Sequence, residues 1–127
     1  MKHQVHVAIQ IVPISKGHPY PIIDNAIAVI KKSGVEYRVG AMETVMQGDY
    51  KKLMAIVKEA QEACLEAGAE EVVVTVKVHA RKNGDVTWEE KLEKYSWRIT
   101  PPLHVVKCYL DLKFIDYALP QFTNLSS

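Results

Sequence analysis

Apolar residues recur at every second position between residues 5 and 12, which is the period of a β-strand with two different faces. Pro13 is expected to end this strand, because proline has no backbone N–H to donate. Between residues 22 and 30, isoleucine and alanine recur at helical spacing, and Gly34 follows shortly after. The pattern therefore predicts a strand followed by an amphipathic helix.

Residues 35–40 and 42–47 are both rich in residues that favour β-structure. Gly40-Ala41 lies between them and favours a turn, so the two segments would form a hairpin. A single long, bent strand fits the same pattern, and the sequence leaves both interpretations open.

A second helix is predicted from Asp49, a suitable N-cap, to Gly68, the type of residue that often follows a last helical turn. Every even position of residues 71–78 is Val, which predicts another long strand. Thr87-Trp88-Glu89-Glu90 fits a capping box, in which Thr precedes Glu by three positions. This motif predicts a short third helix.

The order of these elements predicts an α+β domain of ferredoxin-like βαββαβ topology, with helices on one face of an antiparallel sheet. The opposite face would carry His6, Gln10, Thr75 and Lys77. We expect a single chain to leave that face bare. Such a face is either the floor of a ligand site or an oligomer interface.

The last thirty or so residues have a different pattern. Pro101-Pro102 breaks the chain, and residues 106–114 alternate between apolar and polar, which predicts one extra C-terminal strand that pairs with a sheet edge or covers apolar surface. We therefore place a ferredoxin-like ligand-binding domain at residues 1–95. Residues 96–127 would form a C-terminal extension packed on the same domain or on a partner subunit.

The composition is that of one globular domain: the chain has 127 residues, of which 48% are hydrophobic and 24% charged. A formal net charge of +1 gives no electrostatic reason to expect a nucleic acid or an anionic membrane as partner. No apolar run approaches the ~20 residues of a membrane span. The N-terminal residues are too polar for a secretory signal, so the cytoplasm is the expected compartment.

The sequence contains no nucleophile elbow, P-loop, dinucleotide fingerprint or zinc-protease motif. Its five histidines are scattered, and His3 and His6 would lie on opposite faces of one strand, where they cannot easily share a metal. Cys64 falls in the apolar stripe of a helix and makes a poor nucleophile. The sequence thus predicts no catalytic residues, no metal site and no bound cofactor.

Two charged residues stand out because they occur in strand-like segments. Glu43 lies where Glu is disfavoured in a strand, although a hairpin tip would also tolerate it. Lys77 interrupts the Val-rich strand and either reaches a ligand or carboxylate or lays its stem across the open face. Both are candidates for a binding site.

Four segments and a closing helix carry a resemblance to a known family. They are 7–14, 30–37, 40–48 and 73–78, followed by 87–91. In order and spacing they resemble the thiamine-binding, YkoF-like family of small ferredoxin-like proteins, over residues 5–95. The resemblance implies a subunit that dimerises through its sheets, often forms tetramers, and binds thiamine or hydroxymethylpyrimidine without catalysis.

Carried over by position, Gln10, Met42, Thr44 and Lys77 fall within the family-like strands, whereas Glu43 stands where many relatives have a small residue. That difference puts an inherited contact at Glu43 in doubt.

An aminopyrimidine needs donors and acceptors along its edge and an apolar or aromatic surface against its ring. Gln10, Glu43 and Thr44 can supply the edge contacts. The surface can come from Tyr37, Met42 and Met46.

A positively charged thiazolium would favour a nearby carboxylate, and Lys77 would oppose it unless paired. The leading hypothesis is a non-catalytic homo-oligomer, dimer or tetramer, that binds thiamine or its pyrimidine precursor as carrier, sensor or uptake accessory. The alternative is a structural or regulatory oligomerisation module without a ligand.

Overall fold

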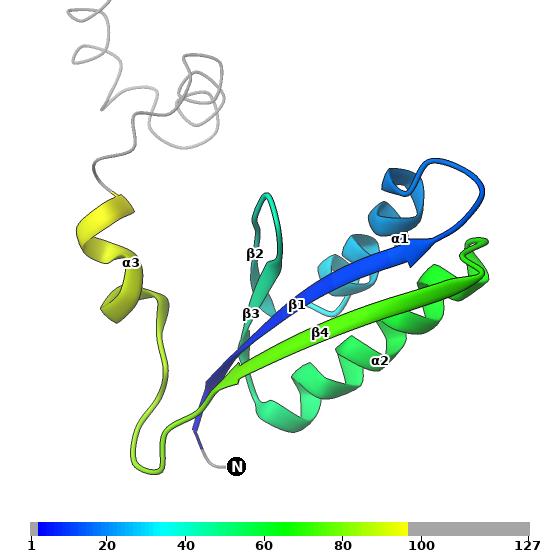
Figure 1. Cartoon of the computed structure of the whole chain (residues 1–127). Helices are drawn as coiled ribbons and strands as arrows, with labels where there is room; N and C mark the ends of the chain where they lie inside the picture. The colour runs from blue at the N-terminus through cyan, green and yellow to red at the C-terminus, as the bar shows by residue number, and fades with distance from the viewer. Residues whose placement is uncertain (1–2, 97–127) are drawn as a thin grey trace, which may run out of the picture. The chain divides into compact units, whose positions relative to one another are not determined.

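The computed structural model describes residues 3–96, which form a four-stranded antiparallel sheet and three helices (Figure 1). In chain order the elements are β1 (Val5–Ile14), α1 (Tyr20–Lys32), β2 (Glu36–Val39), β3 (Thr44–Gly48), α2 (Tyr50–Glu66), β4 (Glu71–His79) and α3 (Trp88–Ser96). The strand order across the sheet is β2-β3-β1-β4. The predicted α+β fold with βαββαβ topology is confirmed.

The segment around Gly40 is a hairpin and not one bent strand. Its strands β2 and β3 pair antiparallel up to Val39 opposite Thr44, and the Gly40 amide donates to the Glu43 carbonyl at 2.9 Å. A Cβ added at Gly40 would lie 2.8 Å from that carbonyl oxygen, which is closer than side chains tolerate. Glycine at position 40 therefore lets the turn close this tightly.

The hydrophobic core lies between the sheet and the two long helices, α1 and α2, which cover the same face (Figure 1). Odd positions of β1 point into it, and Val7 and Ile9 are almost fully buried. Ile30 of α1 and Leu53 of α2 meet them from the helical layer. Burying side chains of this size favours folding by about 1.5–3 kcal/mol each, so the alternation in the sequence determines which face the helices cover.

Local sequence signals set the helix ends as predicted. The Asp49 carboxylate accepts from the Lys52 amide at 3.1 Å, as an N-cap does. At α3, the Thr87 amide donates to Glu90 Oε1 at 3.0 Å, and the Glu90 amide donates to Thr87 Oγ1 at 3.5 Å. These are the reciprocal bonds of a capping box.

The expectation of a bare opposite face is wrong at one end. Trp88, the first residue of α3, is only 7% exposed because its ring lies over that face, 4.4 Å from the His6 ring centroid. The Arg38 guanidinium lies 4.9 Å from the centre of the same indole. The sequence placed Trp88 in the capping box of a short helix but gave no sign of which surface its side chain would cover.

The extra strand predicted at residues 106–114 lies outside the described residues, and the division at residue 95 stays a prediction. Among the described helices, none has the length and hydropathy needed to cross a bilayer.

Candidate functional site

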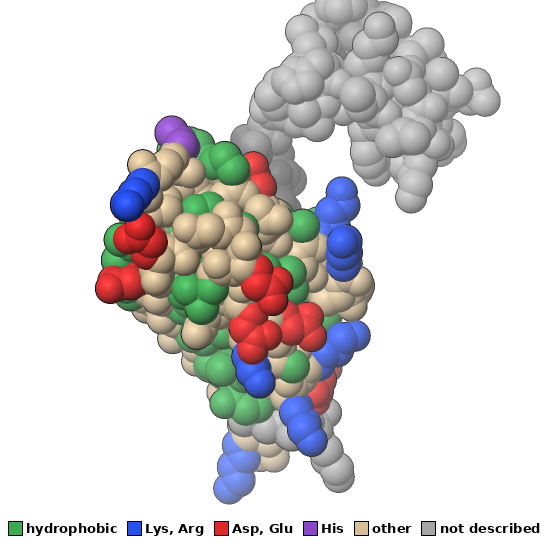
Figure 2. Space-filling model, turned by 90° about the vertical axis from the view of Figure 1, so that its right-hand side faces the viewer, with side chains coloured by type: hydrophobic (Ala, Val, Ile, Leu, Met, Phe, Trp, Pro, Cys, Tyr) green, Lys and Arg blue, Asp and Glu red, His purple; other side chains and the backbone are tan. Residues whose placement is uncertain are grey.

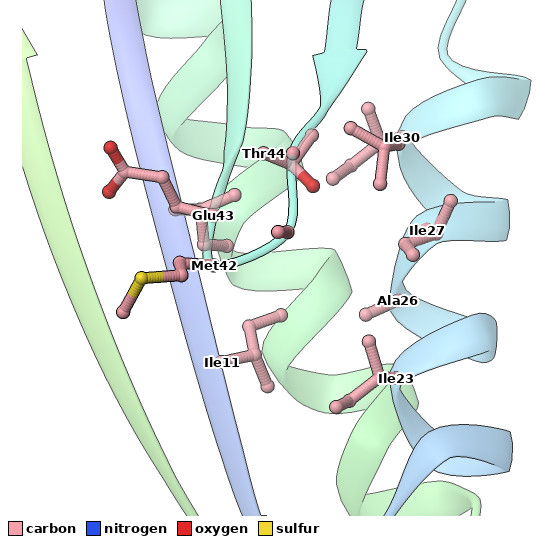
Figure 3. Close-up of a pocket in the computed structure, with 12 residues that line it drawn as sticks. Ile11, Ile23, Ala26, Ile27, Ile30, Met42, Glu43 and Thr44 are labelled. Carbon is pink, nitrogen blue, oxygen red and sulfur yellow. The ribbon is translucent and has the colours of Figure 1, made fainter.

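A cavity of about 120 Å³ lies between β1, α1 and the turn that joins β2 to β3 (Figure 3). Its lining residues are Ile9 and Ile11 of β1, Ile23, Ala26, Ile27 and Ile30 of α1, and residues 39–44. Apart from the side chains of Met42 and Glu43, these residues lie at one end of the helix-covered side of the sheet.

The cavity exists because neighbouring strands have different lengths. The pairing of β3 with β1 begins at Thr44 opposite Ile9, whereas β1 continues to Ile14. Beyond Ile9, the helix-facing side chains of β1 therefore have no β3 neighbour. Ile23 and Ile27 of α1 face this region and stay half-buried, while Ala26 and Ile30 beside them are fully buried.

Thr44 brings a hydroxyl into this apolar lining. The residue is only 7% exposed, and Figure 3 places its hydroxyl on the side that faces α1. Among residues 3–96 the hydroxyl has no hydrogen-bond partner, so it can donate to or accept from a bound molecule. No fully buried side-chain oxygen of these residues lacks a partner, so the hydroxyl reaches solvent, and a ligand atom would replace water there.

Met42 and Glu43 lie at the edge of the cavity, and their side chains turn away from α1 (Figure 3). Met42 is 79% exposed, so the cavity opens to solvent beside the turn. Lys77 Nζ of β4 donates to Glu43 Oε1 at 2.8 Å. The small Ala8, which pairs with Lys77 on β4 and with Val45 on β3, leaves room for this ion pair on the open face.

The two remaining predicted site residues lie away from the cavity. Gln10 is opposite Thr75 on the open face of β1, the reverse side from Ile9 and Ile11. Tyr37 is opposite Met46, half-buried against the core, and does not line the cavity. The structure thus brings Met42, Glu43 and Thr44 together, joins Lys77 to Glu43, and leaves Gln10 and Tyr37 apart.

The α1 side of the cavity was not predicted. The signal was present, because Ile23 and Ile27 extend the apolar stripe of α1 beyond its buried positions. We interpreted that stripe only as core.

A second polar cluster lies at the other end of the sheet, on the open face. Gln47 is its centre: Gln47 Oε1 accepts from the Trp88 amide at 2.9 Å, and Gln47 Nε2 donates to Glu36 Oε2 at 3.0 Å. The Trp88 indole Nε1 donates to the same carboxylate oxygen at 2.9 Å. These contacts fix the orientation of the Gln47 amide, since an N–H cannot accept and a carboxylate cannot donate.

The amide in turn fixes the protons of His6. Because Gln47 Oε1 is an acceptor, His6 Nε2 donates to it at 2.8 Å, and Lys91 Nζ donates to His6 Nδ1 at 2.9 Å. Burial lowers the pKa of His6, the bond to Gln47 opposes this, and the nearby Lys91 and His79 lower it further. Burial also lowers the pKa of Lys91. His6 is therefore a neutral, fully bonded histidine.

A hollow of about 360 Å³ lies between residues 15–22 and 67–70. Beside it, the Ile22 and Ile23 amides both donate to the Pro19 carbonyl. The Tyr20 amide donates to His18 Nδ1 at 3.3 Å.

Figure 2 shows the face of the molecule that faces right in Figure 1, where acidic and basic side chains are interspersed.

Comparison with known proteins adds evidence of a different kind. A family model described as thiamine-binding protein matches residues 7–96. A UPF0045 protein of Clostridium perfringens is 42% identical over 91 residues, which is 71% of this chain and 95% of that protein. A UPF0045 protein of Methanocaldococcus jannaschii is 32% identical over 71% of this chain and 90% of its own length.

Solved structures agree with these matches. A domain of unknown function, DUF77, from Bacillus cereus superposes with a TM-score of 0.73 at 43% identity, covering 77% of this chain and 95% of its own. A Thermotoga maritima protein, suggested to act in thiamine biosynthesis or salvage, gives a TM-score of 0.66 at 31% identity, covering 72% and 98%.

Proposed function

Because this chain belongs to the thiamine-binding protein family, we propose that it binds thiamine or the hydroxymethylpyrimidine moiety of thiamine without catalysing a reaction. It would act as a cytoplasmic carrier, sensor or accessory of uptake. The observation that carries the proposal is the cavity of about 120 Å³ with apolar walls and the unpartnered Thr44 hydroxyl.

The size of the cavity suits one six-membered ring. An apolar cavity of about 150 Å³ takes up a benzene molecule, and this cavity is slightly smaller but open on one side. The isoleucines of β1 and α1 would contact the ring faces, and Thr44 would bond one polar atom of its edge. A second ring, such as the thiazolium of thiamine, would lie outside.

Isothermal titration calorimetry with thiamine and hydroxymethylpyrimidine tests this proposal. Ile27→Trp fills the cavity from α1 and is expected to abolish binding, whereas Ala28→Trp, an exposed position on the same helix, should retain it. Failure of the unaltered chain to bind either compound at millimolar concentration contradicts the proposal, and so does unchanged binding by Ile27→Trp.

We also propose a homo-oligomer, dimer or tetramer, assembled through the open face of the sheet. Val12, Ile14 and Val73 expose apolar side chains there, beside Gln10 and Thr75. Light scattering should report more than one copy, and Val73→Glu should reduce the assembly. A monomeric wild-type protein would contradict this.

The second candidate function is an oligomerisation module without a ligand, which the same exposed valines favour. The two functions separate cleanly, because Ile27→Trp changes only the cavity and Val73→Glu changes only the open face.

A further inference from the structure

The charges around the cavity bear on which ligand it prefers. Among the described residues that line it there is no Lys, Arg or His, and Glu43 is the single ionisable residue. A charged group held at the mouth of such a cavity loses part of its hydration, and only a nearby opposite charge offsets that cost. For a cation, the carboxylate of Glu43 is the one candidate.

Glu43 is already neutralised. Lys77 Nζ lies 2.8 Å from Glu43 Oε1, and no second cation contacts that carboxylate within residues 3–96. At longer range an ion pair acts as a dipole, so its attraction for a third charge is much weaker than that of a bare carboxylate. A cation at the mouth of the cavity would meet almost no net charge.

Thiamine and its pyrimidine half differ in this respect. The thiazolium of thiamine carries a permanent positive charge, whereas hydroxymethylpyrimidine is uncharged at neutral pH. When the pyrimidine ring occupies the cavity, the attached thiazolium lies at the mouth, which opens beside the turn that carries Glu43.

We propose that the Glu43–Lys77 ion pair makes this site selective for the free, uncharged aminopyrimidine over thiamine itself. The inference rests on the proposed function and refines it, since it names which of the two compounds the site prefers. Lys77 determines specificity without touching the ring: it removes the negative charge that a cationic ligand would need.

The test compares the dissociation constants of hydroxymethylpyrimidine and thiamine by calorimetry at low ionic strength, using the full chain. Wild type should bind hydroxymethylpyrimidine more tightly. Lys77→Met leaves Glu43 unpaired and should strengthen the binding of thiamine but not of hydroxymethylpyrimidine. We expect a gain of about three- to tenfold for a thiazolium roughly 7 Å from the Glu43 carboxylate at intermediate dielectric. Added salt should diminish the gain.

Two further variants keep the result interpretable. Glu43→Gln/Lys77→Met removes both charges and should return thiamine affinity to the wild-type value. Lys58→Met removes the same charge from an exposed helical pair with Glu62, remote from the cavity, and should change neither affinity. Circular dichroism melting of each variant confirms that the fold is retained.

The outcomes separate the two proposals. If wild type binds neither compound, the proposed function and this inference both fail. If hydroxymethylpyrimidine binds but Lys77→Met leaves the ratio of the two affinities unchanged, this inference alone is overturned. It is also overturned if the double variant behaves like Lys77→Met, because the gain then does not come from the Glu43 carboxylate.

Discussion

The cavity beneath the β2–β3 turn and the polar cluster around Gln47 lie on opposite sides of the same sheet and differ in how their polar groups are satisfied. In the cluster, His6, Gln47, Glu36, Trp88 and Lys91 bond one another. The cavity, in contrast, combines empty volume with one hydroxyl that has no partner among the described residues.

This contrast shows why buried polarity alone does not identify a site. His6 has a shifted pKa and lies in a group of titratable residues, features that often mark function. Yet every bond it can make is already made, and it leaves nothing for a ligand. We therefore propose that the cluster serves stability and the cavity serves binding.

The largest expected effect is that of Trp88→Ala on stability. The substitution removes a buried indole and the Nε1 bond to Glu36, and losses of this kind cost about 3–5 kcal/mol. Urea unfolding should show a lower midpoint, while the affinity of the remaining folded protein for hydroxymethylpyrimidine should not change. Trp88→Phe keeps most of the packing and should lose less. A large loss of affinity in Trp88→Phe would show that the polar cluster contributes to ligand binding, which contradicts the separation of the two regions.

Thr44→Val should weaken ligand binding and leave stability nearly unchanged, which is the reverse of the result expected for Trp88→Ala. Valine keeps the shape and the strand preference of threonine but removes the hydroxyl, so stability should stay near wild type. The lost hydrogen bond should weaken ligand binding by about fivefold, since one such bond contributes about 1 kcal/mol. Calorimetry and urea unfolding together check this. Thr75→Val removes a hydroxyl from the open face and serves as the control. Equal affinities for Thr44→Val and wild type would remove Thr44 from the site.

Local signals explain why the sequence predicted the fold so well. Alternation in β1 and β4, the Asp49 cap and the Thr87–Glu90 capping box all act within a few residues, and all are found where expected. The expectation that Pro13 ends β1 is wrong, because the strand continues to Ile14 with Pro13 opposite Val72. The hairpin was less certain because Gly40-Ala41 is a weak turn signal, and the tight Gly40–Glu43 closure depends on backbone contacts that sequence does not display.

The candidate site was predicted only in part, because its geometry depends on register and on strand length. Tyr37 was assigned to the ligand, yet pairing opposite Met46 turns it toward the core. Gln10 was expected beside Thr44. Thr44 is opposite Ile9, however, and Gln10, the next residue of β1, points to the other face of the sheet. The pairing of Glu43 with Lys77 joins residues from separate strands, which no local pattern reveals.

The smallest expected effect is a pH dependence that belongs to the cluster alone. Burial lowers the pKa of folded His6 below the ordinary value of 6.5, so the unfolded chain takes up a proton at His6 before the folded protein does. Above about pH 6.5 both states are neutral at this residue and it contributes no pH dependence. As the pH falls below that value stability should decrease, because protonated Nδ1 would face the Lys91 ammonium, with His79 adding positive charge and Glu90 partly offsetting it.

Urea unfolding at pH 7.5 and pH 5.5 should therefore show a larger loss for wild type than for His6→Gln, whose amide can make both bonds without titrating. His79→Gln, at an exposed position on β4, removes one of the charges that lower the pKa of His6 and should therefore reduce the dependence only in part. Ligand affinity, corrected for the folded fraction, should not follow the titration of His6. A parallel fall of affinity in wild type but not in His6→Gln would mean that the cluster and the cavity are coupled through β1, and the separation between a structural and a binding region would have to be abandoned.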